Sequence, residues 1–288
     1  MSHQEAQKAQ KKLLSPPSPA ATTREVSRWN GKAALKPRMD SVAVEEPLEI
    51  RVAGRSVAVT MRTPGHDREL AAGFLLTEGI IRERRDVVEI IHCRAAAAPD
   101  NTLNVFLSPS VKLDLAQLTR HVFATSSCGL CGKASIEAVH QHFPPVKSKL
   151  TVAANIITHL PLLMRRSQAT FAQTGGLHAA ALFDAKGELI VLREDVGRHN
   201  AVDKVLGFGF LDSKLPFEAH ILLVSGRASF EILQKALAAR VPVVCAVSAP
   251  SSLAVDFARE SGQTLVGFLR GETMNIYTGA ERIRIHPL

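Results

Sequence analysis

Residues 220–249 read HILLVSGRASFEILQKALAARVPVVCAVSA. Two apolar runs, at 220–224 and 243–249, enclose a stretch that begins at Ser229 and has apolar residues at helical spacing. A strand, a helix and a second strand in this order form a parallel pair, because parallel neighbours need a crossover connection. The stretch therefore predicts an α/β sheet with helices packed against it.

The segments on either side of this unit repeat the alternation of strands and helices. We expect further strands at 178–184, 188–195, 264–270 and 275–278, and helices at 199–207 and 252–260. Together they predict a mixed, mostly parallel sheet that is covered on both faces. This α/β domain is expected to occupy residues 151–288.

The first half of the chain is richer in strands. Two extended segments, 47–52 and 56–63, flank a glycine-containing turn, which is typical of a hairpin. We further expect a helix from Asp67 that stops near Gly79, strands at 87–93 and 102–108, and short helices at 113–121 and 133–142. A Pro-Pro pair at 144–145 closes this unit. The sequence thus predicts a smaller, strand-rich α+β domain over residues 41–150.

The charge of the chain is concentrated at its amino terminus. Residues 1–38 hold eight Lys or Arg against two Glu, which accounts for six of the eight net positive charges. Because this stretch is also rich in Ala, Ser, Pro and Gln, we expect a disordered basic tail over residues 1–40 and no nucleic-acid partner. No apolar run approaches the ~20 residues that span a bilayer, so we expect a cytoplasmic protein without membrane contact.

Three turns that each follow a predicted strand share a composition suited to anions. They read REDVGRHN, VSGRAS and VSAPSS, and they place small or hydroxyl residues where the backbone N–H groups of a helix begin. In a parallel sheet such turns fall along one edge, where ligands usually bind. Neither a Walker motif nor GxGxxG is present. The turns therefore predict a site for a phosphate-bearing ligand, lined by Arg198, His199, Ser225, Arg227 and Ser248.

Two histidines and two cysteines in the predicted strands and turns allow a functional and a structural interpretation. His178 and His199 are suited to acid–base chemistry or ligand contact, and equally to a hydrogen-bonded structural role. Asp195 and Asp203 lie close enough in sequence to orient His199. Cys93 and Cys245 lie in apolar surroundings, where burial as small hydrophobic residues is expected.

The stretch FATSSCGLCG, residues 123–132, contains the CxxC pair Cys128 and Cys131. A structural zinc site needs four ligands, so His121, His140 or His142 would have to supplement the pair. A thioredoxin-like dithiol usually has an aromatic residue or Pro between its cysteines, and Gly-Leu is a different pair. The third possibility is a carrier loop, in which Gly129 and Gly132 let the backbone bend and the cysteines reach a partner.

Seven segments in order resemble one known family, the FdhD family of formate dehydrogenase accessory sulfurtransferases. They are MRTPGHDRELAAGFLLTEGII, TSSCGLCG, FAQTGGLHAAAL, REDVGRHNAVDKVLG, VSGRASFEILQKA, VSAPSSLAVDFA and TLVGFLRGETMNIYT. The resemblance implies a sulfur carrier: a cysteine desulfurase loads sulfur as a persulfide, which is then delivered to the molybdenum cofactor before this cofactor enters formate dehydrogenase. It also implies a homodimer without a permanent metal.

Site residues follow from the resemblance by position in this chain. The persulfide cysteine is Cys128, with Cys131 as its companion. The segment for bis-molybdopterin guanine dinucleotide is FLRGET, which comprises Phe268, Leu269, Arg270, Gly271, Glu272 and Thr273. The resemblance further implies a three-layer fold like that of cytidine deaminases for the second half. Deaminase activity is not expected, because His178 is followed by Ala179 and Ala180 instead of the His-x-Glu motif.

Two other classes of function compete with sulfur transfer. One is a zinc-stabilised module that binds nucleotide without reacting, with zinc held through the CxxC pair. The other is an amidohydrolase of the deaminase kind. The sequence identifies neither the desulfurase nor the recipient enzyme, and it leaves the role of Cys131 open.

Overall fold

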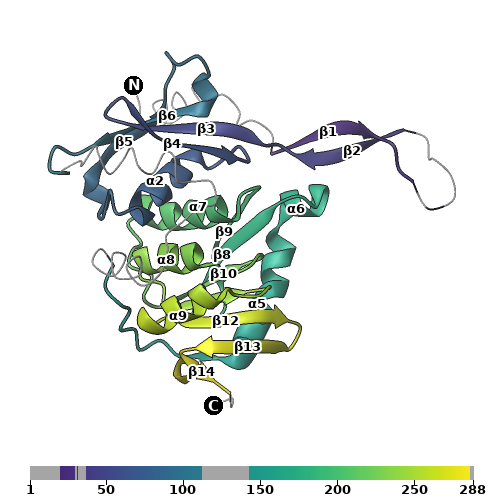
Figure 1. The fold of residues 1–288 in the computed structure, drawn as a ribbon, viewed down its shortest axis with the longest axis vertical. Coiled ribbons are helices and arrows are strands. Elements are labelled where there is room, and N and C mark those ends of the chain that lie inside the picture. The colour runs from purple at the N-terminus through teal and green to yellow at the C-terminus, as the bar shows by residue number, and fades with distance from the viewer. Residues whose placement is uncertain (1–19, 30, 32–36, 112–142, 286–288) are drawn as a thin grey trace, which may run out of the picture.

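The computed structural model describes residues 20–29, 31, 37–111 and 143–285 (Figure 1). The CxxC pair and the helices expected at 113–121 and 133–142 lie outside the described residues, as does the chain before residue 20.

The second half is built on a six-stranded sheet. Its strands are β8 (His178–Asp184), β9 (Leu189–Asp195), β10 (His220–Val224), β11 (Val243–Ala246), β12 (Thr264–Arg270) and β13 (Thr273–Thr278), in the order β13-β12-β11-β10-β8-β9. The three middle strands β10, β11 and β12 are parallel, and the other three pairs are antiparallel. The expected mixed sheet is confirmed, but fewer pairs are parallel than we expected. The reason is that β8–β9 and β12–β13 are joined by short turns, which permit only antiparallel pairing.

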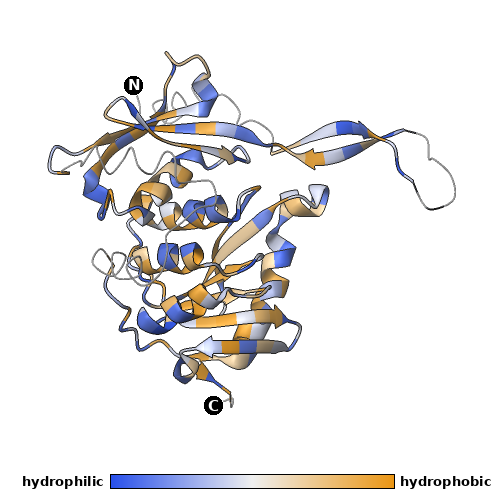
Figure 2. Cartoon of the chain, viewed as in Figure 1, coloured by the Kyte–Doolittle hydropathy of each residue, from blue (hydrophilic) through white to orange (hydrophobic). Residues whose placement is uncertain are grey.

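Helices cover both faces of this sheet, which gives the three layers that we expected. The helices α7 (Arg198–Leu211), α8 (Phe230–Ala238) and α9 (Ser252–Glu260) pack on one face, and α5 (Ala154–Ser167) packs on the other. Along β10, Leu222 belongs to the first apolar cluster and Leu223 to the second, because successive side chains of a strand point to opposite faces. Figure 2 shows the resulting apolar character of the central strands.

Two helices in this half were missing from the sequence-based prediction. They are α5 and the short α6 (Ala169–Thr174). The α5 sequence contains Pro161 and a β-branched run at 156–158, which lowers its helix propensity. Its buried residues Ile157, Leu160 and Met164 nevertheless recur at helical spacing and pack against the sheet. Tertiary packing thus decides the conformation of this segment.

The first half forms a four-stranded sheet that rests on one helix. The strands are β3 (Glu46–Val52), β4 (Arg55–Arg62), β5 (Val87–His92) and β6 (Thr102–Leu107), in the order β4-β3-β6-β5, and the helix is α2 (Asp67–Thr77). The expected hairpin, helix and two strands are all confirmed. One buried apolar cluster extends from Leu48 in β3 to Leu265 in β12. Both halves therefore share a core.

A two-stranded arm precedes this sheet and projects from the body (Figure 1). Its strands β1 (Ala21–Val26) and β2 (Arg38–Ala43) pair antiparallel. Disorder was expected through residue 40, so the expectation is wrong for 21–26 and 38–40. The segment ATTREV contains β-branched residues that favour a strand, and the composition of the whole tail concealed this local preference. The remaining short elements are η1 (Arg84–Asp86), η2 (Pro99–Asn101), β7 (Val152–Ala153), η3 (Ala280–Arg282) and β14 (Ile283–Arg284).

The halves meet where α2 crosses α7, and two glycines allow the crossing. A Cβ atom on Gly73 would lie 1.8 Å from the carbonyl oxygen of Asp203, and one on Gly207 would lie 1.8 Å from the carbonyl oxygen of Glu69. Real Cβ atoms do not approach backbone oxygen so closely. The backbones of α2 and α7 are therefore in direct contact.

Two buried ion pairs lie beside this crossing. The Nζ atom of Lys235 is 2.9 Å from both carboxylate oxygens of Asp203 and from the Thr77 hydroxyl of α2. Burial opposes the charge of Lys235, but the carboxylates of Asp203 and Glu78 outweigh burial and raise the pKa of this lysine. In the second pair, Lys204 lies 2.6 Å from Asp195 and donates to the Thr63 carbonyl. Both pairs tie α7 to the first half of the chain.

We expect Lys235→Met to lower the free energy of unfolding by about 3–5 kcal/mol, because Asp203 would remain buried without its cation. The exposed Arg259–Asp256 pair is a matched control, and Arg259→Met should cost less than about 1 kcal/mol. Urea denaturation of the two variants measures both values. Equal stability of the two variants would show that the buried pair is not ionised.

Candidate anion site at the sheet edge

The predicted turns lie along one edge of the six-stranded sheet. The parallel strands β10, β11 and β12 end at this edge, and β8, which is antiparallel to β10, begins there (Figure 1). The hydroxyl of Ser225 accepts a hydrogen bond from the Ala179 N–H at 2.9 Å, and the carbonyl of Ser248 accepts one from the Phe268 N–H at 3.1 Å. The structure therefore brings together the turns that the sequence analysis selected.

The start of α7, which carries Arg198 and His199, is fixed by a fully buried carboxylate. Asp195 accepts hydrogen bonds from the Gly197 N–H at 2.8 Å and from the Asn200 amide at 3.0 Å. Its other oxygen accepts one from the Thr63 N–H at 3.2 Å and pairs with Lys204. Asp195 thus holds the turn before α7 against the first half of the chain.

His199 has a different partner from the one expected. Its Nε2 atom lies 2.7 Å from the carboxylate of Glu231 and 3.4 Å from the hydroxyl of Ser229. The hydrogen bond from His199 is the main cause that lowers the pKa of Glu231. The expectation that Asp195 and Asp203 orient His199 is wrong, because both carboxylates are used by buried lysines. Glu231 was missed, although an acidic residue in the first turn of a helix is a recognisable signal.

His178, at the start of β8, and Arg198, at the start of α7, both lie beside Gly226. A Cβ atom on Gly226 would lie 3.4 Å from Nδ1 of His178 and 3.9 Å from Cδ of Arg198, which is ordinary van der Waals contact. Burial, followed by the nearby charges of Arg198 and His199, lowers the pKa of His178 and keeps it neutral. The Nε atom of Arg198 is buried, and no described residue accepts a hydrogen bond from it. An anion oxygen would satisfy this donor.

Two helices begin at this edge with free backbone donors. The residues that precede α7 and α8, Gly197 and Ser229, make no side-chain hydrogen bond to the first turn. In α8 the Ile232 N–H donates to the Ser229 carbonyl at 3.1 Å, which leaves the N–H groups of Phe230 and Glu231, together with those of the first turn of α7, available to an anion. The turn before α9 differs, because the Ser251 hydroxyl accepts from the Ala254 N–H at 3.2 Å. In the VSAPSS turn, Ser251 is therefore a helix cap, and its hydroxyl is not free for a ligand.

The segment FLRGET forms the turn between β12 and β13. Phe268 and Gly271 have positive φ angles of 50° and 55°, and a bulge between Gly267 and Arg270 turns the strand. Phe268 is 38% exposed, and the Arg270 guanidinium lies 5.9 Å from its ring centre, on the surface. Leu269 is fully buried in the core between the sheet and α5, so its role is structural.

The width of the edge restricts the kind of ligand that could contact all of it. Four strand spacings of about 4.8 Å separate the end of β9, which leads to Arg198, from the end of β12, which leads to Arg270. The resulting ~19 Å exceeds the size of a single phosphate group. The arrangement suits an elongated ligand with more than one anionic group.

The described residues contain two further cysteines, and the zinc ligands proposed from the sequence lie outside them. Cys245 is fully buried, and burial raises the pKa of its thiol to about 12. Cys93 is only half-buried, so complete burial was wrong for it. Within the described ranges, no three His, Cys, Asp or Glu side chains are grouped closely enough to hold a metal ion. No helix in those ranges is both long and apolar enough to cross a membrane.

Comparison with known proteins identifies relatives along most of the chain. Residues 43–284 match the family model described as the FdhD/NarQ family. The chain is 54% identical to the sulfur carrier protein FdhD of Mycobacterium tuberculosis over 255 residues, which cover 85% of this chain and 92% of the relative. It is 52% identical to the protein of the same name from Streptomyces coelicolor, covering 88% and 92%.

A solved structure is similar over almost the whole chain. It is a crystal structure from Desulfotalea psychrophila, described as a formate dehydrogenase accessory protein. It superposes with a TM-score of 0.74 at 26% identity, covering 92% of this chain and all of that chain.

Proposed function

This chain belongs to the FdhD/NarQ family, and we propose that it is a sulfurtransferase that carries sulfur on Cys128 to the molybdenum cofactor of a formate dehydrogenase. A cysteine desulfurase is the proposed donor, and bis-molybdopterin guanine dinucleotide is the proposed recipient. The names of the sulfur carrier relatives and of the structural neighbour support this proposal. The observation that carries it in the structure is the buried Nε atom of Arg198, which no described residue satisfies, beside the uncapped starts of α7 and α8 at the sheet edge.

The proposed reaction is an exchange of sulfur between thiols. The thiolate of Cys128 attacks the outer sulfur of a donor persulfide, so that an S–S bond forms at Cys128 while the donor S–S bond breaks. The donor leaves as a thiolate, and the outer sulfur keeps its proton as it becomes the terminal sulfur of the Cys128 persulfide. Nothing is oxidised or reduced overall, so the step needs no further reactant.

The proposed role of the sheet edge is to hold the cofactor through its two guanine nucleotides. Their pyrophosphates would accept hydrogen bonds from Arg198, Arg270 and the first turns of α7 and α8. Arg227 is exposed at the same edge and would add a further cation. The Ser225 hydroxyl and the Ser248 carbonyl each accept a hydrogen bond from a backbone N–H at the sheet edge. These two residues would shape the site by fixing the backbone around it.

The chain length permits one cysteine to serve both the donor and this edge. Fifteen residues separate Cys128 from Phe143, so the two residues can be at most roughly 50 Å apart. The helix α7 has 14 residues and measures about 21 Å from the site to its far end. The maximum span of roughly 50 Å between Cys128 and Phe143 therefore exceeds the length of α7, which is about 21 Å.

We expect Arg270→Ala to weaken the binding of guanosine diphosphate about tenfold or more, because a charge-assisted hydrogen bond to phosphate is lost. Arg259→Ala, which removes an equally exposed arginine from the far end of α9, should leave the dissociation constant unchanged. Isothermal titration calorimetry measures both. If neither variant differs from the wild type, the edge does not bind the cofactor through FLRGET.

A further inference from the structure

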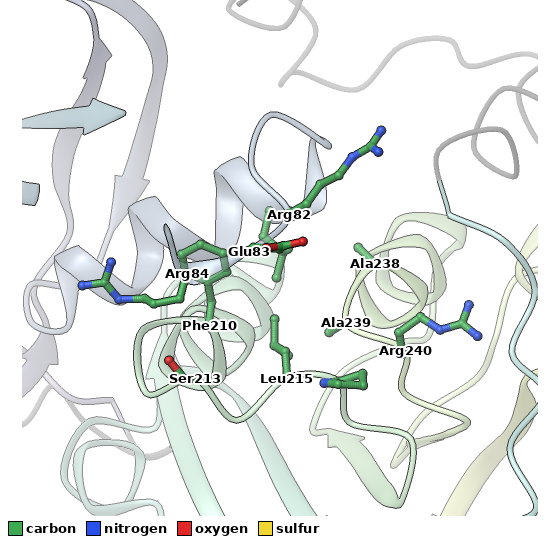
Figure 3. Close-up of a pocket in the computed structure, with 11 residues that line it drawn as sticks. Arg82, Glu83, Arg84, Phe210, Ser213, Leu215, Ala238, Ala239 and Arg240 are labelled. Carbon is green, nitrogen blue, oxygen red and sulfur yellow. The ribbon is translucent and has the colours of Figure 1, made fainter. Parts of the chain in front are cut away.

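A second hollow lies at the opposite end of α7 from the anion site (Figure 3). Its volume is about 320 Å³, and it lies where α2, α7 and α8 all end. Its apolar floor consists of Leu76, Phe210, Leu215, Pro216, Ala238 and Ala239. We call this hollow the helix-end pocket. It is separated from the sheet edge by the ~21 Å length of α7.

The rim of the helix-end pocket presents positive charge that is incompletely neutralised. Figure 3 shows the side chains of Arg82, Arg84 and Arg240 pointing outward from the rim. Arg84 donates to the Val87 carbonyl at 2.6 Å, but no described residue accepts a hydrogen bond from the Arg82 guanidinium. Arg85, which follows, pairs with Glu83 among the described residues, and both of these side chains are exposed. Exposed pairs of this kind exchange partners at little cost.

The rim also fixes the point at which the chain returns from the CxxC motif. Arg240 donates to the carbonyl oxygens of Pro144 and Pro145. These prolines come directly after Phe143, the first described residue beyond the segment that carries Cys128. The helix-end pocket therefore lies beside the point at which the described chain resumes after the segment that contains Cys128.

We propose that the helix-end pocket is the docking site for the protein that donates sulfur, and this inference rests on the proposed function. The donor inserts one apolar side chain between Phe210 and Leu215 and presents carboxylates to Arg82 and Arg85. An apolar anchor with charges at its margin is the usual composition of a binding hot spot. The floor is lined by apolar side chains, which favours an apolar side chain of a protein as the occupant.

This location separates loading from delivery. The donor binds where α7 and α8 end, whereas the cofactor binds where these two helices begin. Donor and cofactor can then occupy the carrier at the same time. The charge on the rim selects an acidic donor surface, because like charges would repel a basic one.

The test uses the full chain and the cysteine desulfurase of the same organism. Two variants alter the pocket: Arg82→Glu reverses a free rim charge, and Ala238→Trp fills the hollow from its half-exposed margin. Arg68→Glu is the matched control, because it makes the same change at the exposed start of α2. Calorimetry should show at least tenfold weaker desulfurase binding for both pocket variants and an unchanged constant for the control. Guanosine diphosphate binding should be unchanged in all three.

Three outcomes would overturn the docking proposal. The first is unchanged desulfurase affinity in both pocket variants together with normal loading of Cys128; in that case the sulfur carrier function still stands. The second is a change in the solution mass of the protein without a change in desulfurase affinity, which would assign the pocket to contacts between copies of this chain. The third is a wild-type protein that neither binds the desulfurase nor gains sulfur, and this result would contradict the proposed function as well.

Discussion

Replacing Gly207 by alanine is expected to lower the free energy of unfolding by more than about 4 kcal/mol. The added methyl group would lie 1.8 Å from the Glu69 carbonyl oxygen, so α2 and α7 would have to separate. Separation would also loosen the 3.1 Å hydrogen bond from the Thr77 hydroxyl of α2 to the Asp203 carboxylate of α7, which crosses the same interface. Alanine favours a helix over glycine by only about 1 kcal/mol, so the clash decides the sign.

The measurement is urea denaturation followed by circular dichroism, with Gly176→Ala as the control. A Cβ atom on Gly176 would have its nearest neighbour at 3.6 Å, which is ordinary contact, so this variant should retain wild-type stability. Gly73→Ala should lower the free energy of unfolding by a similar amount to Gly207→Ala. The double variant should lose less than the sum of the two single losses, because both changes separate the same helices. Wild-type stability of Gly207→Ala would show that α2 and α7 do not touch as described.

Replacing Cys128 by alanine is expected to abolish the maturation of formate dehydrogenase. Without this thiol the proposed carrier has no atom on which to form a persulfide, and Cys245 cannot substitute because its buried thiol stays protonated. The readout is formate dehydrogenase activity in cells that depend on this chain for maturation. Guanosine diphosphate binding to the purified variant should remain normal, since the sheet edge is intact.

Cys93→Ala is the matched control for this experiment, because it removes a half-buried cysteine of the first half. It should support full maturation. The Cys131→Ala variant tests the second cysteine, which could release the spent persulfide as a disulfide or tune Cys128: a persulfide that accumulates indicates release, slower loading of Cys128 indicates tuning, and unchanged turnover indicates neither. Full maturation by the Cys128→Ala protein would rule out the proposed carrier residue.

The strands and most helices of the second half could be predicted because their patterns are local. Apolar runs such as HILLV and the helical spacing after Ser229 depend only on neighbouring residues. The helix α5 could not be predicted in this way, since Pro161 argues against a helix and only the sheet beneath it provides the stabilising contact. The same applies to Gly73 and Gly207, whose importance depends on a crossing between helices distant in sequence.

The sequence predicted which turns form the candidate site, but it did not predict which side chains pair with each other there. The sequence selected the turns that carry Arg198, Ser225 and Ser248, because the ends of parallel strands must share an edge, whereas Arg270 was assigned only through the family resemblance. It assigned His199 to its sequence neighbours, whereas the structure pairs it with Glu231 from the next helix. Pairing across elements depends on which helices lie side by side, and the sequence pattern does not specify this.

The most direct test of sulfur transfer is mass spectrometry of the chain after incubation with a cysteine desulfurase and cysteine. If Cys128 carries the persulfide, the peptide that contains it gains the mass of one sulfur atom and loses it again on treatment with a reductant. A wild-type chain whose Cys128 peptide gains no sulfur, or whose cysteines are blocked by bound zinc, would contradict this assignment.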